Sequence, residues 1–237
     1  MADNYLYPDM SMNRWVNVER RGYLANESQR SLQTEMLHTE PVNITIAGHS
    51  FVRRLNEYAT YQFGSYHNMK IENSVANVTT IGISGLTIDK LLHQHMHRIT
   101  TTNPQIVYIE IGSNDLCDPN GDIRQIGLKI KEACKMLLRL GIKKVIIGEI
   151  VFRFGRGIPR NVPDYNYKVL NLNRFLQVHL DSEAEPRLLF WRHKYVWRSA
   201  LRLYIDGVHY NNDGNKRYFR SVRGALIKSI WSFLDDQ

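Results

Sequence analysis

From residue 42 onward, short apolar runs alternate with longer amphipathic stretches. The apolar runs are rich in β-branched residues and have the length of buried strands, whereas the amphipathic stretches repeat apolar positions at helical spacing. Strands are predicted at 42–47, 75–83, 105–111, 142–151 and 187–191, and helices at 50–63, 87–99, 122–140, 164–180 and 213–234. Strands alternating with helices are typical of a parallel sheet covered on both faces. We therefore predict a single α/β domain over 42–237.

The first 41 residues follow a different pattern. They are polar, show no sustained period and contain Arg20-Arg21-Gly22. We predict a partly ordered N-terminal extension over 1–41, with one short helix near 28–37.

Composition narrows the class of protein. Of the 237 residues, 43% are hydrophobic, which is enough for a core that offsets chain entropy. No stretch approaches the roughly 20 apolar residues of a membrane-spanning helix. Cys117 and Cys134 are too few for a disulfide framework, and the first residues lack the pattern of a secretory signal. We expect an intracellular protein, cytoplasmic or nuclear, without a transmembrane segment.

Four polar turns punctuated by glycine lie next to the predicted elements. Three follow the first three strands, at 48–50, 82–85 and 112–115, and the fourth precedes the last helix, at 206–209. In an open parallel sheet, ligands bind beyond the carboxyl ends of the strands. We therefore expect the four turns to meet at one edge of the sheet.

Together these turns supply the groups for acyl transfer. Ser50 is a candidate nucleophile, and a serine hydroxyl needs a base within hydrogen-bond reach. His209 is the candidate base, with Asp206 orienting its imidazole and stabilising the imidazolium. An oxyanion needs two or three convergent donors, for which the candidates are the Ser50 and Gly85 N–H groups and the Asn114 side-chain amide.

In this order, the four blocks resemble those of the SGNH/GDSL hydrolase family, over residues 44–218. The nucleophile block matches Gly48-His49-Ser50, the glycine block Gly85, the Gly-x-Asn-Asp block 112–115 and the Asp-x-x-His block 206–209. The resemblance implies a flavodoxin-like three-layer α/β/α sandwich with a mainly parallel five-stranded sheet. It also implies ester substrates and a serine mechanism without metal or cofactor.

One position departs from the family, which usually has Asp where His49 stands. The nucleophile, base and oxyanion donors are unaffected, but we expect different hydrogen bonds at the serine turn, which leaves the level of activity open. The stretch 48–55 also resembles SGNH domains associated with animal non-LTR retrotransposon proteins.

Positive charge is concentrated late in the chain. Residues 187–228 hold ten of the 31 Lys and Arg residues but two of the 23 Asp and Glu residues, which leaves the remainder balanced at 21 of each. Aromatic residues alternate with these cations, namely Trp191, Tyr195, Trp197 and Tyr204. Such alternation is typical of nucleic-acid binding, so nucleic acid or anionic lipid is a candidate partner. The alternative is a solvated helix face.

A candidate substrate lip follows the fourth strand, formed by Phe152, Arg153, Phe154 and Arg156. Its arginines can clamp a carboxylate or phosphate. The alternative is a flexible loop that happens to be basic.

A simpler interpretation of Ser50 competes with the enzyme hypothesis. The residue can be a helix N-cap and nothing more, which is a frequent role of serine between a strand and a helix.

A pair of histidines also suggests a metal site. His93 and His97 lie one helical turn apart, but two ligands do not make a metal site, so no metal is expected.

The function predicted is hydrolysis of short acyl (acetyl-type) or lysophospholipid-like esters. The alternative is a weakly active or inactive SGNH-fold module, retroelement-derived, that binds nucleic acid or anionic lipid.

Overall fold

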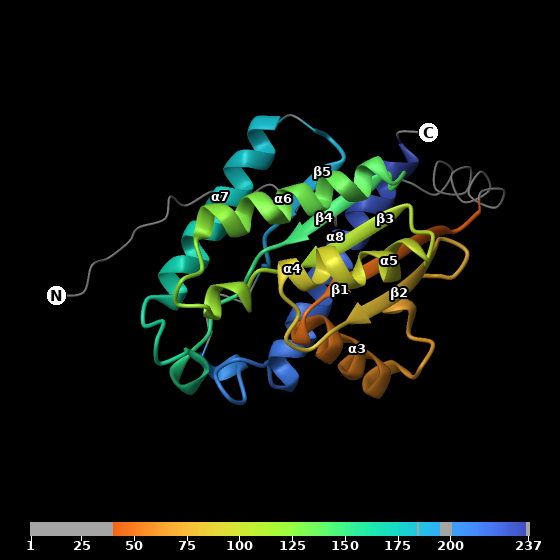
Figure 1. Ribbon diagram of the computed structural model, residues 1–237. Coiled ribbons are helices and arrows are strands. Elements are labelled where there is room, and N and C mark those ends of the chain that lie inside the picture. Colours follow the sequence, from red (N-terminus) through yellow and green to blue (C-terminus); the bar gives the residue numbers. More distant parts are fainter. Residues whose placement is uncertain (1–39, 184, 195–200, 236–237) are drawn as a thin grey trace, which may run out of the picture. The chain divides into compact units, whose positions relative to one another are not determined.

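A computed structural model describes residues 40–183, 185–194 and 201–235 (Figure 1). The predicted extension over 1–41 lies almost wholly outside these residues, as does its helix near 28–37, and both stay predictions.

Within the described residues, five strands form one parallel sheet. They are β1 (Val42–Gly48), β2 (Ala76–Gly82), β3 (Ile106–Glu110), β4 (Lys144–Gly148) and β5 (Leu188–Trp191). Their order is β2-β1-β3-β4-β5, and each neighbouring pair is parallel. The order changes direction between β1 and β3, which is the position at which open α/β sheets bind ligands. The predicted flavodoxin-like fold is therefore confirmed.

Helices connect the strands. The longer ones are α3 (Ser50–Phe63), α6 (Ile123–Arg139), α7 (Tyr165–Glu183) and α8 (Asn212–Leu234). Instead of one helix over 87–99, a π-helical turn η4 (Leu91–His95) lies between α4 (Ile88–Lys90) and α5 (Met96–Thr100). Short 3-10 turns are η3 (Asn68–Lys70), η5 (Asp115–Cys117), η6 (Gly155–Gly157) and η7 (Leu201–Leu203). None of the described helices combines the length and apolarity that crossing a bilayer requires.

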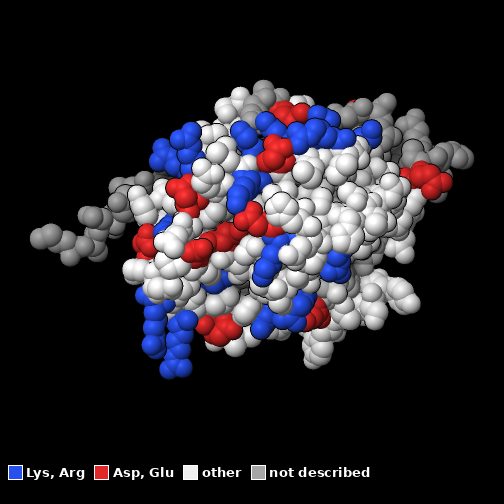
Figure 2. Space-filling model, in the orientation of Figure 1, with Lys and Arg blue, Asp and Glu red and all other residues white. Residues whose placement is uncertain are grey.

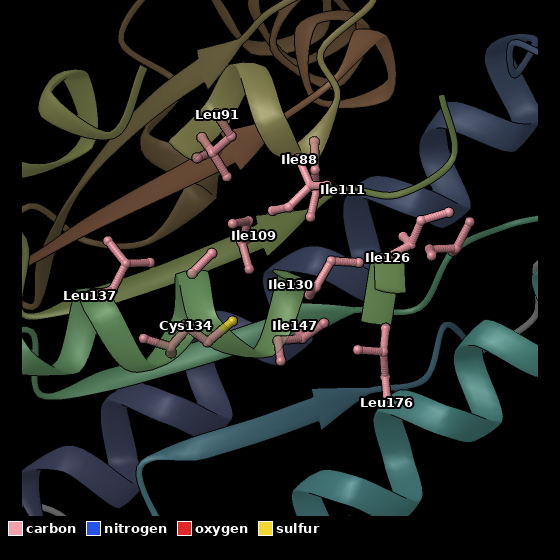
Figure 3. Close-up of a cluster of buried hydrophobic side chains, with 14 of the residues drawn as sticks. Ile88, Leu91, Ile109, Ile111, Ile126, Ile130, Cys134, Leu137, Ile147 and Leu176 are labelled. Carbon is pink, nitrogen blue, oxygen red and sulfur yellow. The ribbon is translucent and has the colours of Figure 1, made fainter. Parts of the chain in front are cut away.

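The sheet is the middle of three layers. One face packs against α4, η4, α5, α6 and α7, and the opposite face packs against α3 and α8 (Figure 1). Because side chains alternate along a strand, Val107 and Ile109 of β3 join the first core, whereas Ile106 and Tyr108 join the second. Figure 3 shows the first core, to which Leu137 of α6 and Ile109 of β3 both contribute side chains.

Gly48 allows β1, β3 and α3 to meet closely at the carboxyl end of the sheet. A Cβ at this position would lie 2.5 Å from the Glu110 carbonyl oxygen and 2.7 Å from the Val52 side chain. Any larger residue would push these elements apart where the chain turns into α3.

We expect Leu137→Ala to lower the free energy of unfolding by about 3 kcal/mol, because it leaves a cavity in the first core. The matched control is Leu140→Ala at the end of the same helix, where the side chain is 57% exposed and a change within about 0.5 kcal/mol is expected. Urea unfolding measures both. Equal losses for the two variants would contradict this assignment of the core.

Candidate functional site

Ser50 is the first residue of α3, and only His49 separates it from the end of β1. The N-cap of this helix is His49, whose Nδ1 accepts a hydrogen bond from the Phe51 N–H at 3.4 Å. Capping is therefore assigned to His49, and the Ser50 hydroxyl is left to interact elsewhere.

The structure brings Ser50, His209 and Asp206 together, although 159 residues separate the first two. His209 Nε2 lies 3.3 Å from Ser50 Oγ, and His209 Nδ1 lies 2.8 Å from Asp206 Oδ2. Asp206 Oδ1 accepts the backbone N–H groups of His209 and Val208 at 2.7 and 2.9 Å. One carboxylate therefore orients both the imidazole and the turn that carries it.

Asp206 stays ionised in this arrangement. Partial burial alone would raise the pKa of its carboxyl group. The hydrogen bonds from the His209 ring and from the backbone N–H groups of His209 and Val208 outweigh this effect, so the pKa falls well below its usual range. The carboxylate is thus available as an acceptor for the imidazole throughout the neutral range.

The turn 206–209 is held by the loop that follows β4. The Phe154 N–H donates to the Gly207 carbonyl at 2.7 Å. Gly207 has a φ of +81°, and a Cβ there would lie 1.8 Å from the Phe154 carbonyl oxygen. The turn can therefore rest on this loop only with glycine at position 207.

The candidate oxyanion donors come from three turns. Asn114 donates through Nδ2 to the Leu86 carbonyl at 3.0 Å, which places its amide beside the Gly85 turn. Gly85 adopts a φ of +68°, and a Cβ there would meet no atom within 4 Å. Among the backbone hydrogen bonds of turns, loops and helix caps in the described residues, none is donated by the N–H of Ser50 or of Gly85.

The structure corrects the predicted substrate lip. Arg153 is 8% exposed, and its guanidinium points inward rather than overhanging the edge of the sheet. Phe152 and Phe154 are half-buried, and the Phe154 ring packs on Tyr204 with centroids 5.2 Å apart. Of the four residues, Arg156 alone is exposed. The segment is drawn inward because Arg153 finds hydrogen-bond acceptors and Phe152 and Phe154 find apolar neighbours.

A buried polar network beneath the site was not predicted. Glu110, at the end of β3, is fully buried and accepts hydrogen bonds from the Tyr218 and Tyr108 hydroxyls at 2.6 and 3.1 Å. His193 Nε2 lies 3.3 Å from the same carboxylate oxygen. Burial alone would raise the pKa of Glu110, but the interaction with His193 and the Tyr218 hydrogen bond bring it below its ordinary value. The sequence offered one signal for this network, namely the position of Glu110 within an otherwise apolar strand.

This network gives a physical account of His49. Its side chain is buried, and desolvation lowers its pKa to about 4, against an opposing effect of Glu110. A neutral imidazole is therefore present near an ionised carboxylate. Asp, the usual residue at this position in the SGNH/GDSL family that the sequence resembles, would add a second negative charge close to Glu110.

The aromatic residues of segment 187–228 do not form an exposed platform where the structure describes them. Trp191 is half-buried and donates its Nε1–H to Ser221 Oγ at 3.1 Å, and Tyr204 is buried. Tyr195 and Trp197 lie outside the described residues. On the face that Figure 2 draws, lysine and arginine side chains lie among acidic ones. The anionic partner stays a prediction.

In the part of the chain that the structure describes, no group of three or more His, Cys, Asp or Glu side chains is arranged to hold a metal ion.

Comparison with known proteins identifies the fold. The sequence matches no family model and no curated protein. Among solved structures, a GDSL-like lipase from Bacteroides thetaiotaomicron superposes with a TM-score of 0.65 at 17% identity, covering 86% of this chain and 98% of its own. A catalytic mutant of an acetylxylan esterase from Geobacillus stearothermophilus gives 0.59 at 13% identity, with 82% and 96% covered. An acetyl esterase mutant gives 0.61 at 15% identity, with 81% and 99% covered.

These similarities show that the chain has the SGNH/GDSL hydrolase fold, as the sequence resemblance predicts. They do not bear on the likeness of 48–55 to retrotransposon-associated domains, which stays a prediction.

The burial of His49 predicts a pH-dependent stability. Its pKa is about 4 in the folded state against 6.5 for a free histidine, so the unfolded chain binds more protons between these values. The stabilisation is complete above pH 6.5 and is lost as the pH falls toward 4, by about 3 kcal/mol. His49→Asn keeps a capping acceptor but does not titrate, so its unfolding free energy should fall less over this range. Urea unfolding at a series of pH values measures the difference, and parallel curves for the two proteins would contradict it.

Proposed function

We propose that this protein is a serine esterase of the SGNH type that hydrolyses short acyl esters, with Ser50, His209 and Asp206 as its catalytic triad. The observation that carries the proposal is the hydrogen-bonded chain from Ser50 Oγ through both ring nitrogens of His209 to Asp206. An imidazole held between a serine and a carboxylate is the arrangement that turns a weakly nucleophilic hydroxyl into an effective one.

In the acylation step, Ser50 Oγ attacks the ester carbonyl carbon while His209 Nε2 takes the hydroxyl proton. Asp206 holds the Nδ1–H tautomer and stabilises the resulting imidazolium. The Ser50 and Gly85 N–H groups and the Asn114 amide stabilise the oxyanion of the tetrahedral intermediate. Collapse of the intermediate breaks the bond to the alcohol, which leaves with the proton of His209.

In the deacylation step, water replaces the alcohol. His209 removes a proton from the water as its oxygen attacks the acyl carbon on Ser50. The second tetrahedral intermediate uses the same donors, and its collapse returns the proton to Ser50 Oγ and releases the carboxylic acid.

The exposure of the site bears on the alcohol part of the ester, and the names of structural neighbours bear on its acyl part. The Asp206 and His209 side chains are 49% and 21% exposed, so they sit at an open edge that a bulky alcohol can approach. Two structural neighbours carry the names acetylxylan esterase and acetyl esterase. An acetyl-type ester is therefore the first substrate class to test, followed by a lysophospholipid.

Ser50→Ala should abolish labelling by a fluorophosphonate probe and lower the hydrolysis of p-nitrophenyl acetate by at least about 10³-fold, because the attacking oxygen is removed. Ser65→Ala is the matched control, since Ser65 is exposed in the loop after α3. In-gel fluorescence and initial rates measure both effects, with circular dichroism confirming the fold. Undiminished labelling of Ser50→Ala would refute the proposal.

Asp206→Asn should lower kcat by roughly 10³- to 10⁴-fold, because the amide no longer holds His209 in the required tautomer or stabilises the imidazolium. The control, Asp213→Asn, changes an exposed acidic residue in the first turn of α8. Steady-state kinetics with p-nitrophenyl acetate compares them. Equal kcat values for the two variants would remove Asp206 from the mechanism.

A further inference from the structure

Arg153 is a buried cation without an acidic partner. Its side chain lies in the interior, and no carboxylate forms a salt bridge with it among the described residues. Its guanidinium donates only to neutral acceptors, namely Asn114 Oδ1 at 3.0 Å, Ser113 Oγ at 3.1 Å and Cys117 Sγ at 2.8 Å. Burying an uncompensated charge is costly, so its presence beside a candidate oxyanion donor calls for an explanation.

The start of α7 fixes the position of Arg153. The guanidinium lies over the Tyr165 ring, 5.1 Å from its centroid, and the Tyr165 hydroxyl is anchored to Ser113. Asn166 brackets the backbone of Arg153, accepting its N–H at 3.0 Å and donating to its carbonyl at 2.7 Å. Both the main chain and the side chain are therefore held, so the guanidinium is pre-organised rather than mobile.

The contact with Asn114 orients the amide of that residue. Arg153 occupies the Oδ1 side, while one N–H of Nδ2 donates to the Leu86 carbonyl at 3.0 Å. The second N–H of the same nitrogen remains available. A positive charge on the oxygen side also polarises the amide, which makes its N–H groups stronger donors.

We propose that Arg153 is a positioning residue for the oxyanion: it holds the Asn114 amide with a free N–H toward the reacting carbonyl oxygen, and its charge polarises that amide toward the negative charge that develops there. The inference rests on the proposed esterase function and deepens it. Because the charge acts on the tetrahedral state more than on the neutral ester, its effect falls mainly on kcat.

The test compares Arg153→Met, which removes charge and donors, with Arg153→Lys, which keeps the charge but replaces the planar guanidinium with a single donor nitrogen. With p-nitrophenyl acetate, Arg153→Met should lower kcat by roughly 10- to 100-fold with KM within about twofold, and Arg153→Lys should recover part of the loss. Inhibition by a boronic acid, which forms a tetrahedral anion on Ser50, should weaken by a similar factor. Arg174→Gln, at an exposed position of α7, should change neither value.

A double-mutant cycle then asks whether Arg153 acts through Asn114. Asn114→Ala alone should cost about 10²- to 10³-fold in kcat, and adding Arg153→Met should lower the rate by no more than about threefold further. Thermal unfolding accompanies each variant. Should Arg153→Met fail to fold, Arg153→Lys takes its place in the cycle.

The outcomes separate the inference from the function. A wild-type protein that neither reacts with fluorophosphonate nor hydrolyses esters overturns both. A labelled and active wild type with an undiminished kcat in Arg153→Met overturns only the inference. Fully multiplicative losses in the cycle show that Arg153 acts independently of Asn114, which also overturns it.

Discussion

The register between β1 and β3, in which Gly48 lies opposite Glu110, is the constraint on which the site depends. Because the two strands are parallel and end at the same level, the turns that carry Ser50 and Asn114 leave the sheet side by side. The glycine at position 48 permits this close approach. The turn at 206–209 then needs to reach only one edge of the sheet to bring His209 to Ser50.

Buried charges of opposite sign act on the serine turn. Glu110 favours protonation of His49, whereas Arg153 disfavours it, and desolvation exceeds both. The carboxylate is offset by His193 and two tyrosine hydroxyls, but the guanidinium has only neutral acceptors. Such groups are costly to bury without their partners, so few substitutions should be tolerated among them. The apolar cores should tolerate more, because side chains of similar size can replace one another there.

Much of the architecture could be predicted from the sequence because strands and helices here differ clearly in period and length. The Ser50–Phe63 helix has the same limits in the structure. Ser50, Gly85 and Asn114 all lie in the turns that follow strands, so the order of elements was enough to bring these turns to one edge. The extent of the helix expected over 87–99 was less predictable, because a π-helical turn interrupts it without a proline or glycine to mark the break.

What could not be predicted is the direction of side chains in loops and at the ends of strands. Arg153 lies in the loop after β4, and Trp191 is the last residue of β5, yet both turn inward, toward Asn114 and Ser221. Whether a loop arginine faces solvent depends on acceptors contributed by distant residues, and local sequence does not encode these. The partners of Glu110 also come from distant parts of the chain, so the sequence predicted the strand that contains this residue but not its hydrogen bonds.

The loop after β4 serves two parts of the site at once. Phe154 supports the turn of His209 through Gly207, and the preceding residue contacts Asn114. An insertion or deletion between 152 and 157 would therefore disturb the turn of His209 and the side chain of Asn114 together. We therefore expect changes of length or sequence to be better tolerated beyond Gly157 or on other turns, because those positions do not support both parts of the site.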